Sequence, residues 1–320
     1  YQMYHELFGT LGSELYFPDR PDGPKLPPQG SGRTVRFHPD KYALELTSGP
    51  TQFSRAFDDW GRHLLSNNSN HVYHEVLAAP YLHRNKNLVV ANTIQTLSDH
   101  GSQVYSITDN PERQLLTSEG VFTSACGITA YKGGAFPAPY DQSITFVAEP
   151  VSNIVHVDVL VDKNTTFQAQ RIETPTGEFM ASTDFWFRPV NMYVGPDGSL
   201  YVLDYYRQII EHPEWMSEEA IQSGELYNGG DMGRIYRITH EDQNTESWME
   251  DLPLSEASSE KLVEHLAHPN AWWRLNAQRL LIDRNATDVQ DQLVQLVNDQ
   301  DSPSSLGRLH ALWTLEGLGT

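Results

Sequence analysis

Reactive side chains crowd together just after a short apolar run in the second half of the chain, and they include Asp204, Tyr205, Arg207, Glu211 and His212. A carboxylate and an imidazole can form an acid–base pair of the kind that oxidation of an alcohol requires. We therefore predict Asp204 and His212 as catalytic residues. The alternative is structural: Asp204 caps a turn and Arg207 pairs with Glu211, because ion pairs at sheet edges are common and individually weak.

Arg188 lies upstream of this group, between an aromatic run and a proline, at the start of an expected strand. A guanidinium can hold a carboxylate or the oxygens of a quinone through two parallel hydrogen bonds. We predict that Arg188 binds an anionic cofactor or substrate, with Tyr205 and Arg207 beside it. The alternative is a structural arginine that donates to carbonyl groups of an adjacent sheet.

Two other groups of side chains could bind a metal ion. Glu149 and His156 end the two strands of an expected hairpin, and a glutamate is a suitable ligand for a hard cation such as calcium. His71 and His74 lie three positions apart in an asparagine-rich stretch, where both imidazoles could approach one ion. No third ligand lies close to that pair in sequence. For both groups a purely structural role is the alternative.

Short strands and tight turns must position these residues. The segment Gly195–Gly198 is a turn signal that leads into a strand, and similar units begin at Gly12 and Asp59. Glycine supplies the positive φ that such turns need. Repetition of this unit predicts a β-propeller built from four-stranded blades. Further strands are expected at 144–148 paired with 153–157, and at 234–238.

The C-terminal part of the sequence has a different periodicity. Apolar residues recur at helical spacing in two similar stretches, 262–281 and 293–315. Pro269 and Pro303 stand where the second helix of each pair would begin. Helix pairs that stack through apolar faces are typical of HEAT-like repeats. We therefore predict a mainly β domain at 1–245 and a helical repeat domain at 255–320.

The composition restricts the partners of this protein. There are 42 acidic and 22 basic residues, with a formal net charge of −20, whereas nucleic acid and anionic membranes call for a basic face. No apolar run reaches the roughly 18 residues that span a bilayer. The single cysteine, Cys126, excludes an intrachain disulfide and any Cys-x-x-Cys haem motif in this sequence.

Five stretches resemble one known family in the order of their motifs: FDDWGRHLLSNNSNHVYHEVLAAPYLHRN from Phe57, TSACGITAYKGGAFPAPY from Thr123, FVAEPVSNIVHVDVL from Phe146, the GPDG-containing stretch from Ala181 to Trp215, and GRIYRI from Gly233. They resemble the membrane-bound dehydrogenase propellers of planctomycetes and verrucomicrobia. Those proteins often carry a C-terminal cytochrome c domain, with HEAT-like helices before it. The resemblance implies a periplasmic, cell-surface or secreted protein with a cytochrome as partner.

More remotely, the chain is similar to the soluble glucose/sorbosone dehydrogenases, which are six-bladed propellers that hold pyrroloquinoline quinone and calcium. That similarity implies a six-bladed propeller, and at about 40–50 residues per blade this sequence would make about five blades. The propeller would then be incomplete here or completed by other residues. Of the paired arginines that contact the quinone, only the second is present, as Arg188, and Trp186 stands at the first. The lysine of that cofactor site falls near Val151.

Two functional hypotheses follow. In the first, the protein is an oxidoreductase that oxidises a sugar or polyol at the channel mouth and passes electrons to a cytochrome. Arg188 would bind the cofactor, and Asp204 or His212 would take the proton. In the second, the propeller is a non-catalytic module that binds a glycan or a protein, and the helices dock it in a larger assembly.

Overall fold

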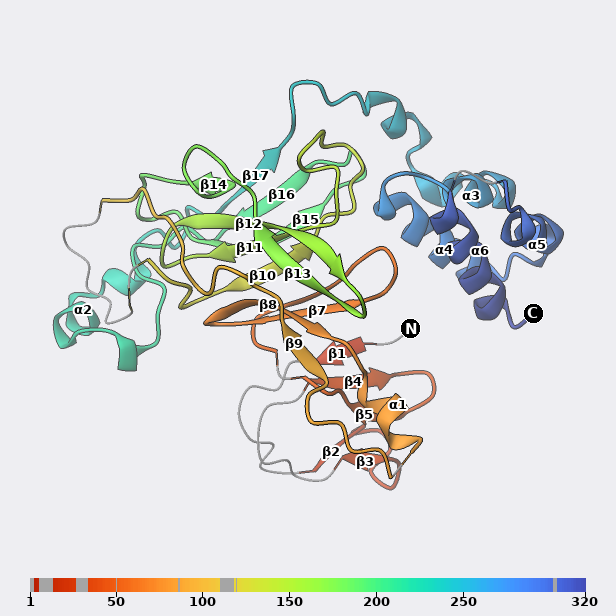
Figure 1. Ribbon diagram of the computed structural model, residues 1–320, viewed down its shortest axis with the longest axis horizontal. Helices are drawn as coiled ribbons and strands as arrows, with labels where there is room; N and C mark the ends of the chain where they lie inside the picture. Colours follow the sequence, from red (N-terminus) through yellow and green to blue (C-terminus); the bar gives the residue numbers. More distant parts are fainter. Residues whose placement is uncertain are drawn as a thin grey trace. The chain divides into compact units, whose positions relative to one another are not determined.

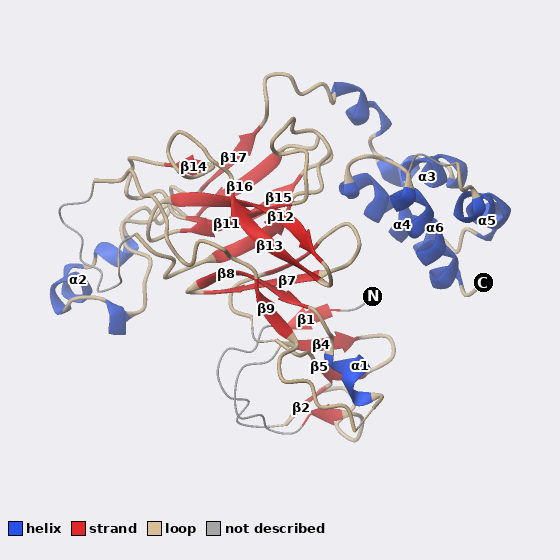
Figure 2. Cartoon of the chain, in the orientation of Figure 1, coloured by secondary structure: helices blue, strands red, loops and turns tan. Residues whose placement is uncertain are grey.

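The computed structural model describes residues 3–5, 14–26, 34–49, 51–85, 87–109, 118, 120–301 and 304–320. These residues form a mainly β structure with helices gathered toward the C-terminus (Figure 2). The prediction of β structure followed by a helical tail is therefore confirmed. The chain divides into two compact units that alternate along the sequence: unit 1 holds 1–130, 143–192 and 202–236, and unit 2 holds 131–142, 193–201 and 237–320.

Two larger sheets of unit 1 are built from strands that are consecutive in sequence and antiparallel (Figure 1). The first has the order β6 (Arg55–Phe57), β7 (His63–Asn67), β8 (Asn70–Glu75) and β9 (Ile94–Thr96). The second has the order β10 (Cys126–Ala130), β11 (Ile144–Glu149), β12 (Ile154–Lys163) and β13 (Thr166–Arg171), and β14 (Met180–Ala181) also pairs with β12.

The other strands form smaller sheets: β1 (Met3–His5) with β4 (Val35–His38) and β5 (Ala43–Leu46); β2 (Leu15–Tyr16) with β3 (Lys25–Leu26); and β15 (Pro189–Val194) with β16 (Leu200–Asp204) and β17 (Arg234–Ile238). The hairpin β11–β12 and strand β17 lie where the sequence predicted strands. The repeat unit expected from Gly12 begins outside the described residues. No closed barrel or propeller is seen among the described strands.

One hydrophobic core is shared by the two larger sheets. Leu64 and Val72 of the first sheet pack with Val147, Leu160 and Phe167 of the second, and all five are nearly inaccessible to solvent. Burial of a side chain of this size contributes roughly 1.5–3 kcal/mol. Because side chains alternate between the faces of a strand, inward-facing polar residues of β8 and β12 are carried into the same region.

Helices form two pairs in unit 2, α3 (Ser259–His265) with α4 (Ala271–Asp283) and α5 (Gln290–Asn298) with α6 (Ser305–Leu318). Two short helices, α1 (Ala79–His83) and α2 (Glu218–Ser223), belong to unit 1. Pro269 directly precedes the Asn270 cap of α4, so it lies just before the helix and not in its first turn as predicted. Pro303 lies outside the described residues. Within the described part of the chain, no helix has the length and apolarity to cross a membrane.

The predicted turn at Gly195–Gly198 is bound to helix α4 within unit 2. The Asn270 side-chain amide donates to the carbonyl of Gly195 at 2.8 Å, and Trp273 Nε1 donates to the carbonyl of Pro196 at 2.8 Å. Tyr131 donates its hydroxyl to the carbonyl of Gly198 at 2.7 Å. The turn therefore leads into β16 and also anchors the first residues of α4.

Gly198 provides a test of this anchored turn. Its φ is +79°, and a Cβ placed on it would lie 2.4 Å from the Cβ of Ala135. Gly61 has a φ of +78° but no neighbour within 4 Å. We expect Gly61→Ala to lower the free energy of unfolding by about 1–2 kcal/mol, the cost of a left-handed alanine. Gly198→Ala should cost roughly 1–3 kcal/mol more because of the clash. Urea unfolding measures both, and equal losses would contradict this packing.

Candidate metal centre and the predicted site residues

Three imidazoles and one carboxylate meet in the shared core of unit 1. They belong to His71 of β8, His100 in the segment after β9, and His156 and Asp158 of β12, and their ligand atoms lie within 4.8 Å of one another. His71, His156 and Asp158 are buried, and the side chain of His100 is 16 % exposed. The residues come from segments that are far apart in the sequence but adjacent in the fold.

Strand geometry and a short stretch of backbone pairing bring these side chains together. His156 and Asp158 are two positions apart on β12, so they face the same side of the sheet. After β9, Leu97 donates its N–H to the carbonyl of Val72 on β8 and accepts from Ala169 on β13. The segment after β9 is thus held between β8 and β13, which places His100 at the edge of the cluster.

Asp158 is the common neighbour of all three imidazoles. Nε2 of His71 lies 2.8 Å from Oδ2, and Nε2 of His156 lies 3.2 Å from Oδ1. Nε2 of His100 lies 3.7 Å from the same Oδ1. Metal–nitrogen bonds of about 2.0 Å would place the ligand atoms of a tetrahedral ion roughly 3.3 Å apart. The separations between Asp158 and the three nitrogens are close to that spacing, and all four ligand atoms lie within 4.8 Å of one another.

Further contacts set the orientation of the rings. Nδ1 of His156 lies 2.6 Å from Oε2 of Glu178, and Nδ1 of His100 lies 3.0 Å from Oδ1 of Asp99. A carboxylate at Nδ1 holds the proton on that nitrogen and leaves the Nε2 lone pair for a metal. The His71 ring stacks on Phe122, with centroids 4.4 Å apart. With the rings held in this way, the Nε2 atoms of all three imidazoles lie near the carboxylate of Asp158.

The electrostatics of the cluster follow from burial and from the carboxylates. Burial lowers the pKa of His71 to about 4, so this imidazole is neutral near pH 7. Burial also acts to lower the pKa of His156, but the nearby Asp158 and Glu178 outweigh it and raise this pKa above the usual value. Burial acts to raise the pKa of Asp158, yet His156 and His71 hold it well below the usual range. The cluster therefore contains an ionised carboxylate and a neutral His71 imidazole, both of which are suitable metal ligands. His156 holds a second proton more readily than usual, and an ion bound at its Nε2 would displace that proton.

The nature of the donor atoms indicates which ions would fit. Imidazole nitrogens suit zinc, copper, iron and nickel, and carboxylates are compatible with each of them. Calcium binds six to eight oxygen ligands, which this cluster does not offer. The cluster is thus suited to a divalent transition-metal ion rather than to calcium.

Two of these ligands were candidates from the sequence, in separate groups. The structure brings His71 and His156 together, whereas their expected companions His74 and Glu149 lie outside the cluster. Nδ1 of His74 is 2.9 Å from the hydroxyl of Thr166. Asp158 was missed, although its spacing from His156 places both on one strand face. His100 carried no signal in the sequence, because only long-range pairing of the backbone locates it.

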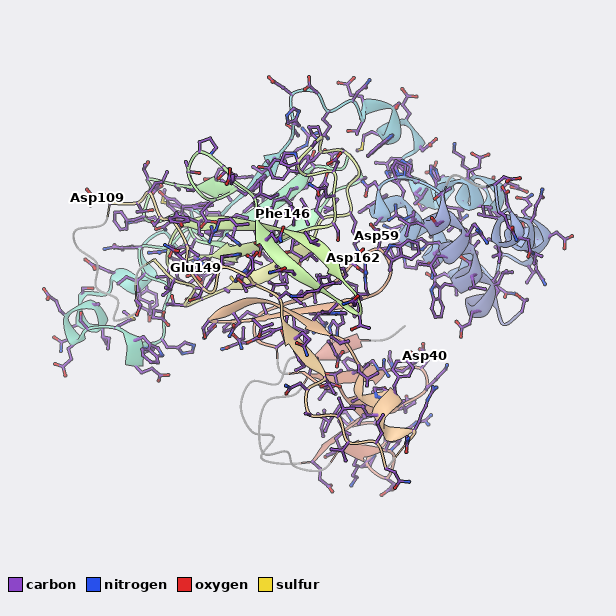
Figure 3. All side chains as sticks on the ribbon, viewed as in Figure 1. Asp40, Asp59, Asp109, Phe146, Glu149 and Asp162 are labelled. Atoms are coloured by element: carbon purple, nitrogen blue, oxygen red, sulfur yellow. The ribbon has the colours of Figure 1, made fainter. Side chains whose placement is uncertain are left out.

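Glu149, which was predicted as a metal ligand, is the last residue of β11 and is fully buried (Figure 3). It binds backbone groups instead of belonging to the cluster. Its Oε2 accepts from the backbone N–H groups of Thr123 and Ser124 at 3.2 and 2.9 Å. Burial raises the pKa of Glu149 to about 8, although these hydrogen bonds act in the opposite direction. The carboxyl group is therefore neutral in the folded protein at pH 7.

Asp204 and His212, the predicted acid–base pair, occupy different environments. Oδ1 of Asp204 accepts from the backbone N–H groups of Arg188 and Tyr206 at 2.8 and 2.9 Å, and burial raises the pKa of Asp204. His212 is exposed, and its backbone N–H donates to Glu211. Among the described residues, no hydrogen bond or ion pair joins Asp204 to His212. This geometry matches the turn-capping alternative for Asp204.

Arg188 and Arg207, two predicted cofactor-binding residues, both donate to backbone carbonyls. Arg188 is 3 % exposed, and its guanidinium donates to the carbonyls of Arg207, Pro150 and Gln208 at 3.0, 2.8 and 2.7 Å. Arg207 donates to the carbonyls of Tyr205 and Tyr206, and its guanidinium lies 4.2 Å from the ring centroid of Tyr205. These contacts match the structural alternative for Arg188.

The fold and the cluster together define a mainly β protein with a candidate metal centre in its core. One family model matches the sequence, a domain of unknown function (DUF7133), over residues 8–242. Since this match spans most of the chain, the chain belongs to the DUF7133 family. No curated protein matches the sequence. The matched region contains all four residues of the cluster and every site residue predicted from the sequence.

The contacts of Arg188 lead to a stability prediction. Arg188→Ala should lower the free energy of unfolding by roughly 3 kcal/mol or more, because it removes a buried side chain and leaves three backbone carbonyls from two segments without their charged donor. His212→Ala, at an exposed position, should change it by about 0.5 kcal/mol or less. Urea unfolding followed by tryptophan fluorescence measures both. Unchanged stability of Arg188→Ala would mean that this arginine is available for a ligand.

The pKa of Glu149 leads to a prediction of pH dependence. Its folded-state pKa, about 8, lies above the usual 4.5, so the native state retains a proton that the unfolded state has lost. This group therefore makes stability fall as pH rises from 4.5 to 8, by up to about 1.4 kcal/mol per pH unit. Glu149→Gln should remove that part of the slope in urea unfolding series. Glu173→Gln, at an exposed glutamate, should keep the wild-type profile, and identical profiles for both variants would contradict the prediction.

Proposed function

We propose that the DUF7133 domain of this chain is a metal-binding domain, in which His71, His100, His156 and Asp158 hold one divalent transition-metal ion. The observation that carries this proposal is the convergence of three Nε2 atoms on one buried carboxylate, with all four ligand atoms within 4.8 Å. Three segments of unit 1 contribute ligands. An ion would therefore cross-link the two larger sheets and the connection between them.

A buried network of hydrogen bonds without metal is the competing explanation. Asp158 has two oxygens, and two imidazoles already lie within hydrogen-bonding distance of them. Nε2 of His100, at 3.7 Å, is a buried atom with no hydrogen-bond partner among the described residues. Other buried polar atoms of the described residues share this state, so the grouping of the ligand atoms carries the comparison. All four lie within 4.8 Å of one another, and a central ion would satisfy this nitrogen together with the other two, which favours metal binding.

A bound ion would supply either a Lewis acid or, if it were iron or copper, a redox centre. The part of this chain is to orient the ligands. Glu178 holds the proton on Nδ1 of His156, Asp99 does the same for His100, and Phe122 fixes the plane of the His71 ring.

The finer expectations from the sequence remain proposals. Sheets β6–β9, β10–β13 and β15–β17 are each made of consecutive strands, which supports successive blades of a propeller. The pairs α3–α4 and α5–α6 support HEAT-like repeats. Oxidation of a sugar or polyol outside the cytoplasm, with pyrroloquinoline quinone as cofactor and a cytochrome as acceptor, is supported by the family resemblance alone. The carbonyl contacts of Arg188 favour the non-catalytic binding module instead.

Metal titration of the purified chain tests the proposal. The protein is stripped with a chelator, reloaded with Zn²⁺, Mn²⁺, Fe²⁺, Cu²⁺ or Ca²⁺ in turn, and analysed for bound metal by elemental analysis and calorimetry. We expect one tightly bound transition-metal ion per chain, no tight calcium, and a melting temperature that rises with free metal because the ion binds only the folded state.

Variants locate the ion. Asp158→Asn and His100→Gln should abolish or strongly weaken the tight site, and His100→Gln is the milder change because its ring is partly exposed. His63→Gln is the matched control, since His63 is a buried imidazole paired with Glu75 and is not a member of the cluster. Absence of a tight site in wild-type protein, or its survival in both cluster variants, would refute the proposal.

A further inference from the structure

Glu178 is a buried carboxylate next to the candidate metal cluster. One of its oxygens contacts a cluster residue, and the other contacts residues that hold the neighbouring segments in place. Only 1 % of the residue is exposed. Oε2 lies 2.6 Å from Nδ1 of His156, and Oε1 accepts from Arg171 Nη1 and from the backbone N–H of Tyr105, both at 2.9 Å. Glu178 therefore contacts one ligand directly and also binds the segment that follows His100.

The turn that carries Glu178 is rigidly built. The hydroxyls of Thr174 and Thr176 both donate to the carbonyl of Glu178, at 2.8 and 3.1 Å. Gly177 has a φ of +79°, and a Cβ there would lie 2.5 Å from the ring of Tyr105. Directly after Glu178, the N–H of Phe179 donates to β12 at Val155, next to His156. The backbone of Glu178 is thus fixed on both sides.

Arg171, at the end of β13, connects this turn with the segment after His100. Its Nη1 donates to the carbonyl of Gly177 at 2.9 Å, in addition to its bond with Glu178. Its Nη2 donates to the carbonyl of Gln103, and its guanidinium lies 4.9 Å from the ring centroid of Tyr105. The arginine neutralises the charge of Glu178 and ties together the two segments that support His156 and His100.

We propose that Glu178 is the positioning residue of the metal centre, which holds His156 with Nε2 toward the ion and fixes the segment of His100. This inference rests on the proposed metal-binding function. A carboxylate at Nδ1 of a ligating imidazole fixes its tautomer and raises its basicity, and loss of such a partner costs about 10–100-fold in metal affinity. Glu178 is not itself a ligand, because its oxygens are engaged by His156, Arg171 and Tyr105.

A second buried His–Glu pair in unit 1 provides a matched control. Nδ1 of His63 lies 2.8 Å from Oε2 of Glu75, and Oε1 of Glu75 accepts a backbone N–H from Ser48. This arrangement shares two contacts with Glu178, since each buried carboxylate lies between an imidazole and a backbone amide, and Glu178 has the bond from Arg171 in addition. It lies outside the metal cluster. Glu75→Gln therefore removes a buried His–Glu contact without the proposed effect on metal.

The experiment compares Zn²⁺ affinity and the visible spectrum of the Co²⁺-loaded protein in wild type, Glu178→Gln and Glu75→Gln. In Glu178→Gln we expect the Kd for Zn²⁺ to rise about 10–100-fold. The d–d bands of bound cobalt should also change, because they report the ligand geometry. Glu75→Gln should leave both unchanged. A merely structural role of Glu178 would alter the melting temperature of the metal-free protein but not the cobalt spectrum.

A second variant covers the case in which Glu178→Gln does not fold. The double variant Thr174→Val and Thr176→Val keeps the carboxylate but removes both side-chain bonds that hold its backbone, and it should weaken Zn²⁺ binding by a smaller factor. Wild-type affinity and spectrum in Glu178→Gln, or in the double variant if only that one folds, would overturn the inference while leaving the metal site intact. Absence of tight metal binding in wild-type protein would instead refute the proposed function, and the inference with it.

Discussion

A charged carboxylate in the core of unit 1 is the constraint on which the candidate site depends. Asp158 is completely buried, and an ionised group in that position is tolerated only when its partners compensate for lost hydration. Two imidazoles lie close enough to do so, and each is in turn fixed by an aromatic ring or by a second carboxylate. The backbone pairings of Leu97 and the turn at Glu178 hold these partners in place.

The polar residues around Asp204 have partners of a different kind from those of the candidate metal cluster. Arg188 and Asp204 are also buried, but their partners are backbone groups of neighbouring segments. Such contacts satisfy the backbone of irregular connections, which otherwise would be left without donors or acceptors. In the candidate metal cluster, by contrast, side chains face side chains, and three imidazoles surround one carboxylate. That combination of donor atoms is the one suited to a metal ion.

Local patterns in the sequence predicted elements well and the site only in part. The turn at Gly195–Gly198, the hairpin β11–β12 and strand β17 follow from glycine at positive φ and from alternation, which are local properties. The helical tail follows from apolar spacing. His71 and His156 were found as metal-ligating types, but nothing local indicates that β8 faces β12. His100 depends on a bridge between residues 98 and 169, which no short-range pattern encodes.

Distances from Asp158 separate His100 from the other two imidazoles. Ring nitrogens of His71 and His156 lie 2.8 and 3.2 Å from its oxygens, within hydrogen-bonding distance, whereas Nε2 of His100 lies 3.7 Å from Oδ1. An ion would engage the lone pairs of all three nitrogens and the carboxylate together. Among the described residues, the candidate ligands and the side chains that orient them all belong to unit 1, so the proposed ion would be held without a ligand from the helices of unit 2.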